Sequence, residues 1–388
     1  MTLATDQLNS RGLRISGSAT RELANSAMGR ENLIPLWFGE PDQSTPQFIC
    51  DSAAKALKNG ETFYTEGLGK PFLREAIATY QNNLYDCNMA TDRIAVTLSG
   101  GNALNLAFQS ILDDGDKMVT TLPSFPNLLA IPALQGADVQ AVNIRPTEDG
   151  WKLDIDEFLD RAKGAKVVLL NSPNNPTGWT LNHDEQRYIL DELRNRGTWI
   201  IADDVYSRLY YDGKAAPAFL EISQPEDRLI VVNSFSKAWA MTGWRIGWLT
   251  LPASLTPTVE KLMEYSAACV PAFTQHAALS AITKGEDFIE TSNQRYLKSL
   301  EVVSKRLSEF PNIKFPRPNA AFYAYFQING VTDNMAYARK ILDETGVGLA
   351  PGIAFDPDAK DWFRLCFANS TDRINEAFDR MTPLLLSQ

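Results

Sequence analysis

The sequence predicts an α/β fold, with a large domain built on a mainly parallel sheet covered by helices and a smaller α+β domain. The chain has 388 residues, of which 44% are apolar. A chain of this length usually divides into more than one domain, each with its own hydrophobic core. Short apolar runs alternate with helical or loop segments, a pattern typical of parallel strands joined by covering helices. The expected strands are 93–98, 117–121, 139–144, 167–171, 199–202, 229–233 and 246–250.

The pattern changes after about residue 252, and this change indicates the second domain. A long helical pattern runs over 274–306, strand-like alternation over 315–328, and another helical pattern over 334–345. We therefore expect an arm plus part of the small domain over 1–40, a large domain over 41–280 and a small domain over 281–388.

Composition excludes several classes of partner. The formal charge of −10 argues against a nucleic-acid surface or an anionic membrane as the main partner. The four scattered cysteines and two histidines form neither a disulfide framework nor a metal site. The first residues lack the basic and apolar regions of a secretory leader, and no apolar run approaches the roughly 18 residues of a membrane span. We expect a cytoplasmic protein without a metal.

Lys237 is the first candidate for chemistry. It follows the apolar, β-branched run 229–233 at the carboxyl end of an expected buried strand, where open α/β sheets bind their ligands. Loss of hydration there favours the neutral amine, which can add to a carbonyl and form a Schiff base. A single lysine in such a pattern is more often an ordinary surface residue, so the interpretation depends on other groups.

A strand, a glycine pair and a helix form a candidate anion cradle. Ser99, Gly100 and Gly101 follow the strand 93–98, and the next helix has apolar residues at helical spacing. The glycines let an anion approach the first N–H groups of the helix, and Ser99 adds a hydroxyl. The same layout often serves only as a tight turn, and it matches neither of the nucleotide-binding glycine motifs.

Other expected strands also end in functional groups. Phe125 lies between two prolines and could stack on a planar ring. Asn175 belongs to an amide-rich segment, 171–178, which is also a good turn sequence. Asp203 follows a buried strand, where a carboxylate needs a partner, and a protonated pyridine nitrogen would suit it. Arg364 lies among apolar residues and is either an edge-strand charge or a clamp for a carboxylate.

Taken together, these motifs resemble the class I/II aminotransferases, the aspartate aminotransferase-like enzymes of fold type I that depend on pyridoxal phosphate. The resemblance runs along most of the chain and keeps the order of the family's motifs. It includes Gly39-Glu-Pro-Asp42, Tyr64, the stretch 70–78, the stretch from Asn233 to Trp248, and Arg364-Leu-Cys-Phe-Ala-Asn369.

The resemblance implies a role for each group around the cofactor ring. Lys237 would form the internal aldimine with pyridoxal 5'-phosphate and later move the α-proton of the substrate, and Asp203 would keep the pyridine nitrogen protonated. Asn175 and Tyr206 would donate to the phenolic oxygen. Phe125 would stack on the ring.

The resemblance also implies the phosphate and substrate contacts. The phosphate would be held by Ser99, Gly100, Gly101, Ser234, Ser236 and Arg245, and by Tyr64 of a neighbouring subunit, so a homodimer with shared active sites is expected. The substrate would contact Gly39, Asn175 and Arg364. Independently of the resemblance, the bulky Phe38 is either a core residue, which is the commoner role of such aromatic groups, or a wall of the substrate pocket.

The implied activity is amino transfer between an L-amino acid and a 2-oxo acid by a ping-pong mechanism. The same scaffold also serves β-eliminating carbon–sulfur lyases and related synthases, which remain an alternative. A ligand-sensing module without turnover ranks last, because no attached DNA-binding segment is visible.

The substrate side chain is not identified by the sequence. No motif residue supplies the second cation that a dicarboxylate would need, and Trp37, Phe38 and Phe125 favour apolar or aromatic side chains. One departure from the family pattern is Ala320, which occupies a position where the family usually has glycine; its methyl group is expected to tighten the approach of the small domain.

Overall fold

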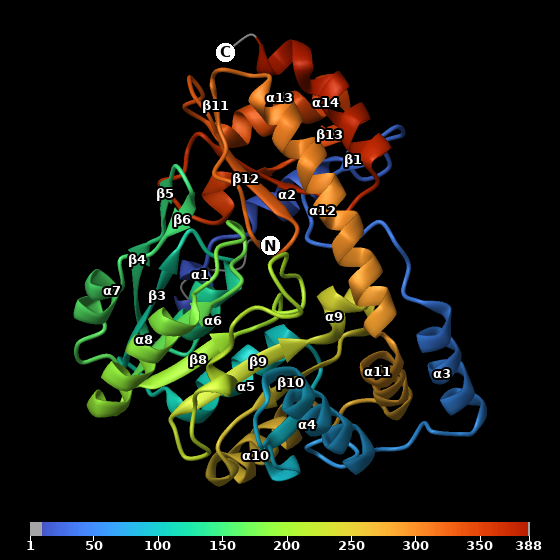
Figure 1. Ribbon diagram of the computed structural model, residues 1–388, viewed down its shortest axis with the longest axis vertical. Coiled ribbons are helices and arrows are strands. Elements are labelled where there is room, and N and C mark those ends of the chain that lie inside the picture. Colours follow the sequence, from blue (N-terminus) through green and yellow to red (C-terminus); the bar gives the residue numbers. More distant parts are fainter. Residues whose placement is uncertain (1–9, 387–388) are drawn as a thin grey trace, which may run out of the picture.

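The computed structural model describes residues 10–386, which form a large α/β body with a smaller sheet-and-helix unit beside it (Figure 1). Residues 1–9 of the expected N-terminal arm lie outside the described residues. The described part of the arm contains α1 (Ser10–Arg14) and α2 (Ala19–Ser26). Within residues 10–386 no helix has the length and apolar character needed to cross a bilayer.

The large sheet has seven strands in the order β2-β10-β9-β8-β7-β3-β4. Strands β9, β8, β7, β3 and β4 pair in parallel, whereas β10 is antiparallel to both of its neighbours. This arrangement confirms the mainly parallel sheet. The strands are β2 (Ile94–Thr97), β3 (Lys117–Leu122), β4 (Asp138–Asn143), β7 (Val167–Asn171), β8 (Trp199–Asp203), β9 (Leu229–Ser234) and β10 (Gly247–Thr250).

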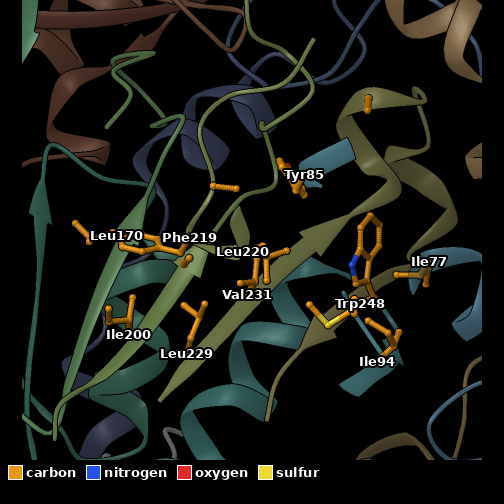
Figure 2. Packing of buried hydrophobic residues seen from close by; sticks show 14 of the residues in the cluster. Ile77, Tyr85, Ile94, Leu170, Ile200, Phe219, Leu220, Leu229, Val231 and Trp248 are labelled. Carbon is orange, nitrogen blue, oxygen red and sulfur yellow. The ribbon is translucent and has the colours of Figure 1, made fainter. Parts of the chain in front are cut away.

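Both faces of the large sheet are buried, which explains why its strands read as continuous apolar runs. Alternate residues of each strand enter different clusters: in β9, Leu229 and Val231 join one and Ile230 and Val232 the other. Figure 2 shows Leu229 and Val231 with Trp248 and other side chains of the first cluster. The covering helices are α3 (Gln47–Lys58), α4 (Pro71–Tyr85), α5 (Gly100–Ile111), α6 (Asn127–Leu134), α7 (Ile155–Arg161), α8 (His183–Arg196), α10 (Thr256–Ala267) and α11 (Ala272–Lys284).

The smaller unit is built on a four-stranded antiparallel sheet in the order β11-β12-β15-β14. A third apolar cluster lies between this sheet and its helices. Strand β1 (Ile34–Pro35) pairs in parallel with β13 (Val347–Gly348), which ties the N-terminal segment to this unit. The other elements are β11 (Ile313–Lys314), β12 (Tyr323–Ile328), β14 (Ala350–Pro351), β15 (Trp362–Cys366), α12 (Glu286–Ser308), α13 (Asn334–Thr345) and α14 (Thr371–Leu385), and a hairpin of β5 (Arg145–Thr147) and β6 (Gly150–Lys152) lies nearby.

Two expected elements differ in extent from the structure. The helical pattern 274–306 is divided at Gly285 into α11 and α12. Only a glycine fits at this junction, since a Cβ on Gly285 would lie 2.6 Å from the indole of Trp239. The strand expected over 315–328 begins only at Tyr323. Pro316 and Pro318 lack the N–H that a ladder requires, so the preceding segment is a loop.

The fold brings the expected functional groups to one edge of the large sheet. Asn171, Asp203 and Ser234 are the last residues of β7, β8 and β9, and the carboxyl ends of parallel strands meet at the same edge. The smaller unit faces this edge. The domain boundaries at 40 and 280 remain a proposal, which the separate apolar clusters of the two sheets support.

Candidate active site

Lys237 lies on the short helix α9 (Phe235–Ala238), directly after β9. Its Nζ donates to the carbonyl oxygen of Gly39 at 2.5 Å and lies 5.7 Å from the centre of the Tyr206 ring. Burial lowers the pKa of this amine to about 8, and the nearby Arg364 guanidinium also lowers it. A substantial neutral fraction near neutral pH makes Lys237 suited to nucleophilic attack or proton transfer.

Asp203 ends β8 with a carboxyl group that is almost completely enclosed. The residue is 5% exposed and accepts a hydrogen bond from Val205 N at 3.3 Å. Burial raises the pKa of this carboxyl to about 7, against the smaller opposing effects of that hydrogen bond and of the Lys237 charge. Within residues 10–386 no ion pair compensates it, so a cationic ligand atom beside Asp203 would be strongly favoured.

The predicted anion cradle forms at the start of α5. Ser99 caps this helix, because its Oγ accepts from Asn102 N at 3.0 Å, and the N–H groups of Gly100 and Gly101 have no partner within the helix. A Cβ on Gly100 would lie 3.3 Å from the Ser234 side chain, so the two segments adjoin. Ser234 Oγ is 2.9 Å from Ser236 Oγ. N–H and hydroxyl groups therefore converge on one position.

Arg364 is a buried clamp on β15. It is 4% exposed, its Nη1 donates to Asn175 Oδ1 at 2.7 Å, and its Nη2 donates to the Trp37 carbonyl at 2.5 Å. The guanidinium lies between the rings of Tyr323 and Phe355, 4.3 and 4.5 Å from their centres. Arg364 is thus fixed in position, unlike an edge-strand charge facing water. Because the carbonyl oxygen of Asn175 faces Arg364, its amide nitrogen remains a donor.

Tyr323 adjoins the expected site residues but was not among those named from the sequence. Its hydroxyl lies 2.7 Å from the hydroxyl of Tyr206, and both side chains are buried. Only one hydrogen fits between two hydroxyl oxygens, so the pair retains a second O–H that can donate elsewhere. Tyr323 also lies close to Gly39, where a Cβ would be 1.8 Å from its hydroxyl oxygen. The only available signal was its place at the end of the segment that contains Ala320.

Asn171 was also missed, although it connects two expected groups. Its Nδ2 donates to the carbonyl of Asp203 at 3.0 Å and its Oδ1 accepts from Asn175 N at 2.8 Å. These bonds fix the turn that carries Asn175 against the end of β8. A polar residue ending an apolar strand was the signal that could have found it.

Ala320 is completely buried and forms a bridge with Tyr210 of the large body. The left-handed backbone conformation falls at the next residue, Ala321, with φ of 58°. Ala321 N donates to Leu209 O at 2.7 Å, which holds that conformation. The methyl group of Ala320 therefore fits without requiring an unusual backbone at its own position.

Four of the site residues expected from the sequence are exposed or only partly buried in the single chain. Arg245 is exposed, in a left-handed conformation with φ of 55°, and donates to Thr242 O at 2.8 Å. Phe125 is 37% exposed and Tyr64 is 90% exposed, whereas Phe38 is partly buried at the edge of the small-sheet cluster. Arg245 lines an open groove of about 630 Å³ together with Gln43, Ser44, Thr45, Leu98, Ala240, Thr242, Gly243, Trp244, Pro271, Phe273 and Thr274.

The donor set fits pyridoxal phosphate. A buried carboxylate without a cation, Asp203, suits a protonated ring nitrogen, and the cradle at Ser99 and Ser234 suits a phosphate. Lys237 supplies an amine of lowered pKa between these features and the Arg364 clamp. Together, the fold and these side chains suit an enzyme that binds pyridoxal phosphate at the carboxyl edge of its large sheet.

Comparison with known proteins places the chain in a family. The family model "Aminotransferase class I and II" matches residues 31–381, so the chain belongs to this family of pyridoxal-phosphate-dependent aminotransferases. A probable N-acetyl-LL-diaminopimelate aminotransferase from Bacillus subtilis is 33% identical, covering 98% of this chain and 96% of that protein. An aspartate aminotransferase from Pyrococcus horikoshii is 32% identical, covering 97% and 96%. The structure of an aspartate aminotransferase from Thermotoga maritima is similar with a TM-score of 0.88 and 32% identity, covering 97% and 100%.

Proposed function

We propose that this aminotransferase moves an amino group between an L-amino acid and a 2-oxo acid by a ping-pong mechanism, with Lys237 as the reactive amine. The observation that carries the proposal is the position of Lys237 Nζ, which donates to Gly39 O between the Asp203 and Arg364 sites and has a pKa lowered to about 8. The relatives described above are named for different amino acids, so similarity alone does not assign the substrate.

The residues around Lys237 would have separate roles in substrate binding and proton transfer. Arg364 and the amide of Asn175 would bind the α-carboxylate of the substrate, because a guanidinium with fixed orientation pairs well with a carboxylate. Lys237 would bind the cofactor and then carry the α-proton of the substrate. When bound, pyridoxal phosphate supplies an aldehyde and an electron-withdrawing ring that stabilises negative charge at the α-carbon.

Other residues would hold the cofactor in place. Asp203 would pair with its ring nitrogen, the spare hydrogen of the Tyr206–Tyr323 pair would reach its phenolic oxygen, and Phe125 would cover one face of the ring. The phosphate would be held by Ser99, Gly100, Gly101, Ser234, Ser236 and Arg245.

We also propose a homodimer in which Tyr64 reaches the phosphate of the other subunit. Phe63, Tyr64 and Tyr265 are 83%, 90% and 91% exposed, and they lie on neighbouring segments because Thr65 Oγ1 donates to Val270 O at 2.9 Å. Exposed aromatic groups on adjacent segments are typical of a protein interface. The cytoplasmic location expected from the sequence likewise stays a proposal.

The absorption spectrum of the purified protein with pyridoxal phosphate tests the function. We expect the band of the bound aldehyde form to disappear when an amino-acid mixture is added without 2-oxo acid, and to return when a 2-oxo acid follows. Lys237→Ala should show no such covalent band, and Lys284→Ala, which changes a lysine at the end of α11, should behave as the wild type. Release of ammonia and pyruvate without need of a 2-oxo acid would instead assign the carbon–sulfur lyase.

A further inference from the structure

Three cationic side chains from other parts of the chain contact the short segment 37–39. The carbonyl of Trp37 accepts from Arg364 Nη2, and the carbonyl of Gly39 accepts from Lys237 Nζ. Between them, the ring of Phe38 lies beneath the guanidinium of Arg21, whose Cζ is 5.2 Å from the ring centre. Two of these cations are accounted for by the α-carboxylate and the α-carbon of a substrate, whereas Arg21 is not.

Helix α2 carries Arg21 next to the elements that hold Arg364. Helix α2 packs against β14 and against the 3₁₀ turn Gly352–Ala354. The residue after this turn is Phe355, whose ring lies against the Arg364 guanidinium, and β14 pairs with β15 at Arg364 itself. The guanidinium groups of Arg21 and Arg364 are therefore carried by packed, adjoining elements.

The charge of Arg21 is available to a ligand. Its side chain is exposed, and no ion pair of Arg21 occurs in the part of the chain that the structure describes. The neighbouring acid, Glu22, pairs instead with Arg339 at 3.1 Å. An arginine stacked on an aromatic ring keeps its N–H edge free for a carboxylate.

We propose that Arg21 is a specificity-determining residue, which binds an anionic group at the far end of the substrate side chain. This inference rests on the proposed function, because it uses the same site with Arg364 on the α-carboxylate. It also changes the meaning of Phe38, which the sequence analysis read as favouring apolar or aromatic side chains. In the structure its ring supports a guanidinium, so the pocket selects amino acids whose side chains end in a carboxylate.

Paired acid and amide substrates test this inference in the enzyme loaded with pyridoxal phosphate. The kcat/KM of glutamate is compared with that of glutamine, and aspartate with asparagine, since each pair differs in charge at nearly constant size. We expect Arg21→Gln to lower the acid-to-amide ratio about 10- to 100-fold. Arg21→Lys should retain part of the preference, and Glu22→Gln on the same helix should keep the wild-type ratio.

Binding without turnover provides a second readout. Succinate carries two carboxylates and butyrate, of the same length, carries one, so calorimetric titration of the loaded enzyme separates the two cations. We expect the wild type to bind succinate more tightly than butyrate, and Arg21→Gln to bind the two with similar affinity. A succinate preference that survives in Arg21→Gln, together with an unchanged acid-to-amide ratio, overturns the inference while the proposed function stands. If no amino acid alters the cofactor spectrum of the wild type, the proposed function and the role of Arg21 are both refuted.

Discussion

The two ends of the active site differ in how much of their structure this chain completes. At the proposed substrate end, Arg364 is held by Asn175 and Trp37. At the cofactor end, Asp203 has a single backbone donor, and Arg245 and Phe125 are exposed. The substrate end is preorganised by internal hydrogen bonds, whereas the cofactor end leaves its polar groups available.

This difference shows where each end obtains its stability. A buried guanidinium whose two Nη atoms already have acceptors keeps its geometry without ligand, so binding costs little reorganisation. A buried carboxylate without a cation is unfavourable until a positive partner arrives, so cofactor binding should stabilise the fold by mass action. The first two predictions change the cofactor end, the third changes the substrate end, and the fourth tests the boundary with a second chain.

The largest effect is expected for Lys237→Ala. The substitution removes both the amine that reacts with the cofactor and the group that carries the α-proton, so kcat should fall by at least about 10⁴-fold. Single-turnover kinetics with added pyridoxal phosphate measure it, and circular dichroism checks that the fold persists. Residual turnover above about a tenth of wild type would refute the role of Lys237.

Asp203→Asn should lower kcat by about 10²- to 10⁴-fold, because a neutral amide does not hold a proton on the ring nitrogen. It should also change the pH dependence of the cofactor-free protein. Burial raises the pKa of Asp203 from 3.8 to about 7, so the folded state keeps a proton that the unfolded chain has released between these values.

The sign of this pH effect follows from proton linkage. The contribution of Asp203 to stability is fully present below pH 3.8 and is lost as pH rises through about 7, a decline of up to about 4 kcal/mol. Denaturant unfolding at pH 5 and pH 8, without cofactor, should show a smaller decline for Asp203→Asn than for the wild type. Equal declines in the two proteins would contradict the assigned pKa.

At the substrate end, Gly39→Ala should lower kcat/KM by about 10- to 100-fold, since the new Cβ would lie 1.8 Å from the Tyr323 hydroxyl and force that ring to move. The double variant Gly39→Ala with Tyr323→Phe removes the atom in closest conflict and should recover part of the loss. If the single variant retains full activity, the contact between Gly39 and Tyr323 does not position the site.

The smallest effect is expected for Tyr64→Phe, which removes one hydroxyl from a side chain that is 90% exposed in the single chain. If a second copy places this hydroxyl on the phosphate, the affinity for pyridoxal phosphate should fall about 10-fold, as for one hydrogen bond to a charged group. Equilibrium dialysis measures the affinity, and sedimentation equilibrium should show two chains per particle. A monomer whose affinity does not change would exclude shared sites.

Three of the site residues expected from the sequence lie at or just after the ends of buried strands. Ser99, Asp203 and Lys237 were found because the carboxyl ends of parallel strands must meet at one edge of the sheet. Arg364 of the small unit was named because a single arginine stands in an apolar strand, whereas Tyr323 and Arg21 carry no such local signal. Their position depends on how the small unit and the N-terminal helix dock against the large sheet, and no local periodicity encodes that docking.

Helix α12 has 23 residues, a length of about 34 Å, and its two ends belong to different cores. Ile289 packs into the cluster of the large sheet, and Leu300 and Leu307 pack into that of the small sheet. Between these residues, Arg295 donates two hydrogen bonds to the Asp42 carboxylate, at 2.6 and 2.7 Å. Because the helix is long, a small change in its angle produces a large displacement. A tilt of about 5° at one end moves the other end by about 3 Å, roughly the length of one hydrogen bond. A change in the angle of this helix would therefore move the small unit, which carries Arg364, relative to the large sheet, which carries Lys237.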